Sequence, residues 1–147
     1  MKILIANGVN LQQLGTREVD IYGSTSFESY LSELKSLYPD VQFEFFQSDN
    51  EGDLANVVAN AKDYDGIILN AGAYTHSSVI MADAVRTTPC PVVEVHISNL
   101  FGREQYRKNS VLSSCCVGFI SGFGLDSYRL AVESFVGKKS IRVKPKE

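Results

Sequence analysis

The spacing of hydrophobic positions changes repeatedly along the chain, from that of buried strands to that of helices. Apolar runs at 2–6, 66–70 and 92–96 are short and nearly continuous, which is typical of strands covered on both faces. Apolar and polar residues alternate over 41–45, as in a strand with one covered face. A further apolar run, "CCVGFI" at 115–120, predicts a fifth strand.

Helical spacing fills the segments between these runs. The stretch "TSFE" at 25–28 has the form of a capping box, so a helix should begin there, and Pro39 should end it. Apolar residues at 54, 57, 58 and 61 recur every three or four positions, and 77–86 is a further expected helix, ended by "TTPCP". The same spacing over 128–135 predicts a last helix.

This regular alternation of strand and helix predicts a parallel sheet with helices on both faces. Right-handed crossovers then favour an α/β fold, a flavodoxin-like doubly wound sandwich with a five-stranded parallel sheet. The chain contains no linker, internal repeat or low-complexity segment, so we expect residues 1–147 to form a single domain.

Composition narrows the class of protein further. The 147 residues are 44% hydrophobic and 21% charged, the balance of a globular domain, and a net charge of −3 does not favour nucleic acid as a partner. No apolar run has the length of a membrane helix, and "MKILIA" is too short for a signal peptide. Three cysteines, two of them adjacent, form no disulfide framework. We therefore expect a cytoplasmic protein.

Polar side chains follow three of the predicted strands, at the edge where ligands bind in open α/β sheets. Both histidines of the chain fall at this edge, and their shared location favours a site over two unrelated structural histidines. The candidates, in chain order, are Asn7, Asn10, Arg17, Tyr22, Asn70, His76, Glu94, His96, Ser98, Asn99, Arg103 and Arg107.

Several familiar site chemistries do not fit the sequence. The glycine-rich stretch "GFISGFG" at 118–124 lacks the order of a phosphate-binding loop, and no nucleophile elbow occurs. The histidines have no neighbouring array with metal-ligand spacing, so we expect no metal. Lys108 adjoins charged residues instead of an apolar pocket, which does not favour a Schiff base.

Three edge segments, "NGVNLQQLGTREVDIYGS", "ILNAGAYTHSS" and "VEVHISNLFGREQYR", resemble the type II 3-dehydroquinate dehydratases, and so do "QSDNEGDL" and "GFISGFG". The resemblance covers nearly the whole chain. Two departures occur: Val9 stands where the family usually has proline, and Gln12 and Gln13 replace a more common pair. Neither departure removes a reactive group.

The resemblance implies that one catalytic domain dehydrates 3-dehydroquinate to 3-dehydroshikimate in the shikimate or quinate pathway, with no cofactor and no metal. In the family's roles, Tyr22 is the general base, Arg17 favours its phenolate, Asn10 holds a water at the enolate oxygen, and His96 is the general acid. Substrate-binding positions match Asn70, His76, Ile97, Ser98 and Arg107, and Asp83 matches a residue offered across a subunit interface. The resemblance further implies a homododecamer built from trimers.

The chemistry of the base can be weighed directly. A phenol with an ordinary pKa of about 10 is a poor base at neutral pH, and lowering that pKa to about 7 requires about 4 kcal/mol. One guanidinium at about 4 Å supplies on the order of 4 kcal/mol, while burial acts against the phenolate. Arg17 alone is barely sufficient, so we expect a second positive group, with Arg103 the candidate.

A second class of function stays open at the level of sequence. A flavodoxin-like module could bind a small acid as a sensor without converting it. A signalling receiver would need acidic residues after the first strand, where Ala6 and Asn7 stand instead. The presence of Tyr22, Arg17 and His96 together favours the enzyme.

Overall fold

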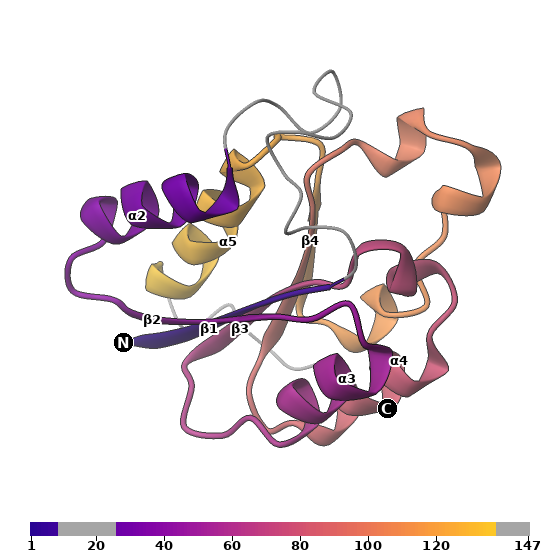
Figure 1. Ribbon diagram of the computed structural model, residues 1–147, viewed down its shortest axis with the longest axis horizontal. Helices are drawn as coiled ribbons and strands as arrows, with labels where there is room; N and C mark the ends of the chain where they lie inside the picture. Colours follow the sequence, from indigo (N-terminus) through magenta and orange to yellow (C-terminus); the bar gives the residue numbers. More distant parts are fainter. Residues whose placement is uncertain (9–25, 138–147) are drawn as a thin grey trace.

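The computed structural model describes residues 1–8 and 26–137 and contains the predicted five-stranded parallel sheet. The strands are β1 (Lys2–Asn7), β2 (Gln42–Gln47), β3 (Gly66–Asn70), β4 (Val92–His96) and β5 (Gly118–Ser121). They lie in the order β2-β1-β3-β4-β5, and every neighbouring pair is parallel (Figure 1). This is the flavodoxin-like strand order, so the predicted fold class is confirmed.

Three of the described α-helices lie between strands, namely α2 (Phe27–Leu37), α3 (Glu51–Ala59) and α4 (Val79–Thr87), and α5 (Asp126–Val136) follows β5. The cap of α2 is Ser26, whose hydroxyl accepts the N–H of Ser29, so the helix begins one residue later than the predicted capping box. Within the described ranges no helix is long and apolar enough to cross a membrane.

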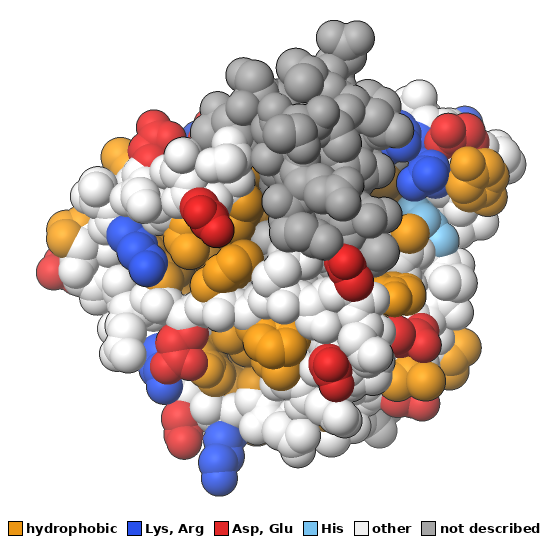
Figure 2. Space-filling model, viewed as in Figure 1, with side chains coloured by type: hydrophobic (Ala, Val, Ile, Leu, Met, Phe, Trp, Pro, Cys, Tyr) orange, Lys and Arg blue, Asp and Glu red, His pale blue; other side chains and the backbone are white. Residues whose placement is uncertain are grey.

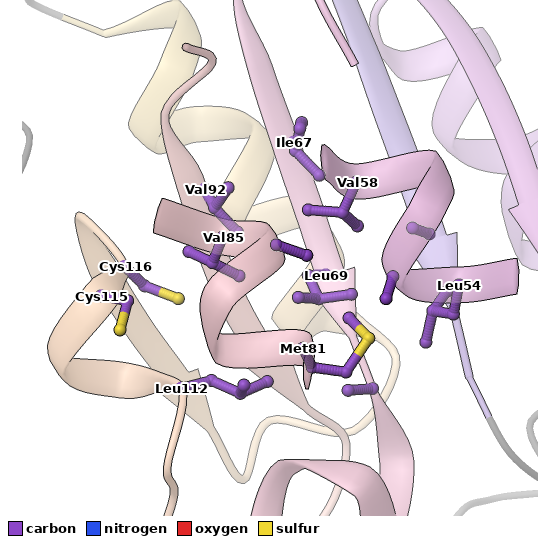
Figure 3. Packing of buried hydrophobic residues seen from close by; sticks show 14 of the residues in the cluster. Leu54, Val58, Ile67, Leu69, Met81, Val85, Val92, Leu112, Cys115 and Cys116 are labelled. Atoms are coloured by element: carbon purple, nitrogen blue, oxygen red, sulfur yellow. The ribbon is translucent and has the colours of Figure 1, made fainter. Parts of the chain in front are cut away.

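The helices cover both faces of the sheet. Helices α2 and α5 lie on one face, and α3 and α4 on the other (Figure 1). Alternation along each strand supplies both layers: Ile3 and Ile5 of β1 pack toward α2 and α5, while Leu4 packs toward α3. Figure 3 shows the layer between the sheet and helices α3 and α4, in which Met81 of α4 lies beside Leu69 of β3.

The fifth strand begins later than its hydrophobic run predicts. Cys115 belongs to a 3-10 turn, η5 (Ser113–Cys115), and its N–H donates to the carbonyl of Leu112 at 2.8 Å. The hydroxyl of Ser110 accepts the N–H groups of Leu112 and Ser113 and so stabilises this turn. The prediction of a strand from residue 115 was wrong. Cys115 and Cys116 are buried because the turn packs against α4, and neither residue pairs with a strand.

Every strand ends, at its carboxyl terminus, in a polar residue: Asn7, Gln47, Asn70, His96 and Ser121. Asn7 lies directly opposite Asn70 in the β1–β3 register. The chain leaves β1 and β3 toward opposite faces, which makes this pair the switch point at which doubly wound sheets bind ligands. Gly8 is required there, because a Cβ at this position would lie 2.5 Å from the carbonyl oxygen of Ala71.

A polar cluster far from these strand ends should make stability depend on pH. The phenol of Tyr64 donates a hydrogen bond to the carboxylate of Glu44, which also pairs with Lys2 at 3.2 Å. This hydrogen bond, with burial, raises the pKa of Tyr64 to about 12. A raised pKa stabilises the fold below the ordinary tyrosine pKa of about 10, and the contribution is lost as the pH rises through the folded value.

We therefore expect Tyr64→Phe to be less stable than the wild type at pH 8, and the difference to shrink between pH 10 and pH 12. Urea denaturation of both proteins at a series of pH values measures this difference. A difference that stayed constant up to pH 12 would show that the Tyr64 hydroxyl does not contribute through this hydrogen bond.

Candidate active site

The end of β4 carries a buried pair of acid–base groups. Nε2 of His96 lies 2.5 Å from Oε2 of Glu94, and the two side chains are 5% and 0% exposed. Residues two apart on a strand project to the same face, so the pair lies on the α3 and α4 side of the sheet. Because Nε2 is bound to the carboxylate, Nδ1 is the ring nitrogen that remains to act on a ligand.

Two hydroxyl groups complete the surroundings of Glu94. Thr75 Oγ1 donates to Oε2 at 2.7 Å, and Ser110 Oγ lies 2.9 Å from both carboxylate oxygens. All of these neighbours are hydrogen-bond donors, which suits an ionised carboxylate that can only accept. Glu94 thus ties together β4, the turn η2 (Gly72–His76) and the segment that follows η4 (Gln105–Arg107).

Removal of this buried charge should cost stability. In Glu94→Gln an amide nitrogen replaces one of the two acceptor oxygens, so one of the donors around it loses its partner. We expect the free energy of unfolding to fall by about 3 kcal/mol. Urea denaturation measures this loss. The control is Glu33→Gln on the exposed face of α2, which should change stability by less than about 0.5 kcal/mol. Equal effects of the two changes would contradict the assigned network.

The second histidine, His76, is held by Nδ1, whereas His96 is held by Nε2. Nδ1 lies 2.7 Å from the carbonyl oxygen of Asn109. A carbonyl only accepts, so Nδ1 carries the hydrogen and Nε2 of the neutral ring is an acceptor. His76 directly follows Thr75, whose hydroxyl contacts Glu94, so the structure links the segments of the two histidines through one carboxylate.

Two arginines lie in the loop after β4. The guanidinium of Arg103 donates to the hydroxyl of Ser98 at 3.0 Å, and that of Arg107 pairs with Glu104 at 2.9 Å. A backbone N–H hydrogen bond, and then the positive charge of Arg107, lower the pKa of the Glu104 carboxyl. The guanidinium of Arg103 beside the Ser98 hydroxyl suits the recognition of a carboxylate.

The remaining predicted binding residues lie at the ends of β3 and β4. Asn70 is buried, and its Nδ2 donates to the hydroxyl of Tyr128 at 2.8 Å. Ile97 packs its side chain in the core, and its carbonyl accepts the N–H of Gly124 at 3.0 Å. Gly124 has a φ of +62°, in the left-handed region that favours glycine, so this turn can fold back over the end of β4.

One predicted site residue, Asp83, lies apart from the Glu94–His96 pair, and others lie outside the described residues. The carboxylate of Asp83 lies on α4, is 69% exposed and pairs with Arg86 of the same helix at 3.1 Å. Asn10, Arg17 and Tyr22 lie outside the described residues, as do Val9 and the two glutamines, so the expected pairing of Arg103 with Tyr22 stays a prediction.

The structure adds partners that the sequence did not identify. Thr75 and Ser110 bind Glu94, and Tyr128, which the sequence placed only on a core face, bonds to Asn70. The spacing of Glu94 and His96 was a usable signal, since a period of two on a strand brings such residues together. Among the residues that the structure describes, no three His, Cys, Asp or Glu side chains are grouped to hold a metal ion.

These features define a class of protein. Histidine, basic and acidic side chains gather at one margin of the face seen in Figure 2. A doubly wound sheet presents a buried histidine–carboxylate pair, asparagine amides and arginines at the carboxyl ends of its strands. The molecule is therefore a flavodoxin-like α/β protein with acid–base groups at its ligand-binding edge.

Comparison with known proteins gives the family. The model of the class II dehydroquinases matches residues 1–136, and the chain belongs to this family. It is 50% identical over 137 residues to the 3-dehydroquinate dehydratase of Exiguobacterium sp. strain AT1b, covering 92% of this chain and 94% of the relative. A 3-dehydroquinate dehydratase of Pelodictyon phaeoclathratiforme is 44% identical over 144 residues, covering 96% of this chain and 95% of the relative.

Solved structures agree with this assignment. The crystal structure of the type II dehydroquinase from Butyrivibrio crossotus superposes with a TM-score of 0.89 at 37% identity, covering 93% of this chain and 98% of that one. A match over nearly the full length of both chains means that fold and sequence lead to the same family.

Proposed function

We propose that this protein is a 3-dehydroquinate dehydratase that eliminates water from 3-dehydroquinate to give 3-dehydroshikimate. The observation that carries the proposal is the buried Glu94–His96 pair at the end of β4. A base removes the proton α to the ketone, the electrons form an enolate, and the C1 hydroxyl leaves as water once an acid protonates it. The new double bond is conjugated with the ketone.

His96 is the proposed acid for the departing hydroxyl. The carboxylate of Glu94 fixes Nε2, so a proton would be delivered from Nδ1. The proposed base is Tyr22, activated by Arg17, with Asn10 holding a water at the enolate oxygen. These three roles are supported by the match of "NGVNLQQLGTREVDIYGS" to the family.

Binding of the substrate is assigned to groups around this pair. Arg107 and the Ile97–Ser98 backbone would hold the carboxylate, and the arginine supplies the positive charge that such a group needs. Asn70 and His76 would bind hydroxyl groups, since Nδ2 of Asn70 has a second hydrogen beyond the one given to Tyr128 and Nε2 of His76 is left as an acceptor. The reaction as proposed uses no cofactor and no metal.

Asp83 would complete the site of a neighbouring subunit in a homododecamer built from trimers. Its carboxylate is exposed, and its hydrogen bonds do not reach the other proposed site residues that the structure describes. This suits a side chain that contacts a neighbouring subunit. We further propose that residues 1–147 form one catalytic domain that works in the cytoplasm, where its three free cysteines would stay reduced. Light scattering of the purified protein tests the assembly.

Ultraviolet absorbance tests the activity, because the conjugated product absorbs where the substrate does not. Purified protein should give a steady rise in absorbance with 3-dehydroquinate, and the rise should be unaffected by a metal chelator. The second candidate function is a sensor that binds a small acid without converting it. Binding of 3-dehydroquinate in calorimetry with no absorbance rise would establish the sensor and reject the dehydratase.

A further inference from the structure

Three buried side chains form a hydrogen-bonded relay across the switch point of the sheet. Asn7 ends β1, Asn70 ends β3, and Tyr128 reaches them from α5; their exposed fractions are 0%, 2% and 0%. Nδ2 of Asn70 donates to the Tyr128 hydroxyl at 2.8 Å, and that hydroxyl donates to Oδ1 of Asn7 at 2.8 Å. Neither Asn7 nor Tyr128 has a role in the proposed reaction.

The orientation of both amides follows from one backbone group. The N–H of Gly72 can only donate, and it bonds to Oδ1 of Asn70 at 3.2 Å. The oxygen of Asn70 is thereby fixed, so its nitrogen must face Tyr128. The phenol accepts from that nitrogen and turns its single hydrogen to the oxygen of Asn7. Neither amide can then flip without the loss of a buried hydrogen bond.

The phenol is suited to stay a donor. Burial raises the pKa of Tyr128 well above its usual range, so the hydroxyl keeps its proton at any physiological pH. Its ring packs against Phe27 and Tyr30, with centroids 4.9 and 6.3 Å away, which holds the hydroxyl in place. The relay therefore has one stable direction.

The relay does not use all the N–H groups of its two amides. Nδ2 of Asn7 is buried and has no hydrogen-bond partner among the described residues, and Nδ2 of Asn70 has a second hydrogen beyond the one given to Tyr128. A buried donor without a partner costs about 1–3 kcal/mol. Asn7 and Asn70 lie side by side at the position where ligands bind in this fold, so an oxygen of a bound molecule can remove the cost.

We propose that Tyr128 is a positioning residue of the active site: through Asn7 and Asn70 it holds the Asn70 amide with an N–H toward an oxygen of the substrate. The proposal rests on the proposed dehydratase activity. Tyr128 acts through Asn70 and does not itself touch the substrate. Its loss should therefore weaken binding while the chemical step stays nearly unchanged.

Steady-state kinetics with 3-dehydroquinate test this role. Tyr128→Phe removes one oxygen and keeps the packed ring, and we expect KM to rise about tenfold with kcat changed less than about threefold. The control is Tyr38→Phe, a ring packed against the same core cluster whose hydroxyl bonds to Glu133 at 2.6 Å. This control should leave both constants unchanged.

A double-mutant cycle separates positioning from general destabilisation. In an Asn70→Ala background, Tyr128→Phe should raise KM by less than about twofold, because its target is already absent. An equal KM increase in both backgrounds would overturn the proposal, as would a lowered Tm with KM unchanged. If Tyr128→Phe does not fold, Asn7→Ala removes the acceptor of the hydroxyl instead and should give the same KM increase. Absence of turnover by the wild type would reject the dehydratase itself.

Discussion

His96→Asn should lower kcat by about 10²- to 10⁴-fold, the usual contribution of a positioned general acid. The expected loss has a structural reason. Glu94 holds Nε2, so the ring presents only Nδ1 to the departing hydroxyl, and no other described side chain in the Glu94 network has a titratable nitrogen. KM should change much less, because the proton is transferred only in the transition state.

The other histidine provides a matched comparison. His76→Asn changes a side chain of the same type that is anchored to Asn109 and assigned to binding. We expect this variant to raise KM by about tenfold and to lower kcat only slightly. Steady-state absorbance measurements on both variants separate the effect on KM from the effect on kcat. A loss of kcat that is equal in the two variants would mean that the acid has been assigned to the wrong histidine.

Tyr22→Phe should lower kcat/KM by at least about 10²-fold, since it removes the only oxygen that can accept the proton from carbon in the proposed reaction. Substitution by phenylalanine retains the ring, so the change tests the hydroxyl alone. The control is Tyr38→Phe, whose hydroxyl bonds to Glu133 at 2.6 Å on the surface of α2 and α5. The absorbance assay compares the two proteins at one pH.

The pH profile adds a second readout for the base. Wild-type kcat/KM should decline on the acid side as the Tyr22 phenolate is protonated, and this limb should be absent from the residual rate of Tyr22→Phe. If the variant keeps more than one tenth of wild-type activity with the same acid limb, another group is the base. The roles of Arg17 and Arg103 as activators would then lose their basis.

Much of the fold was predictable because strands buried on both faces must be apolar throughout. The runs of β1 and β3 fulfil this demand up to the asparagine that ends each strand, whereas β4 departs from it at the buried Glu94. The start of β5 was not predictable from hydrophobicity. Cys115 and Cys116 are both buried, yet Cys115 belongs to a turn that the Ser110 hydroxyl stabilises through the N–H groups of Leu112 and Ser113, contacts that the hydrophobic pattern does not reveal.

The candidate site likewise contains residues whose positions were predictable and contacts that were not. The placement of His96, His76 and Asn70 at one edge was predictable, because parallel strands bring their carboxyl ends together there. The contact of Tyr128 with Asn7 spans 121 residues of sequence, and only the docking of α5 on the sheet brings the two together. In the same way, Thr75 and Ser110 meet Glu94 from separate loops 35 residues apart.

Alternation along the strands places two parts of the proposed site in opposite layers. The amides of Asn7 and Asn70 lean toward α5, whereas Glu94 and His96 lean toward α3 and α4. The Asn70 amide and the His96 ring thus lie in separate packing environments that meet at the rim. Engineering of one helical layer offers a route to retune recognition while the proton-delivering half is left intact.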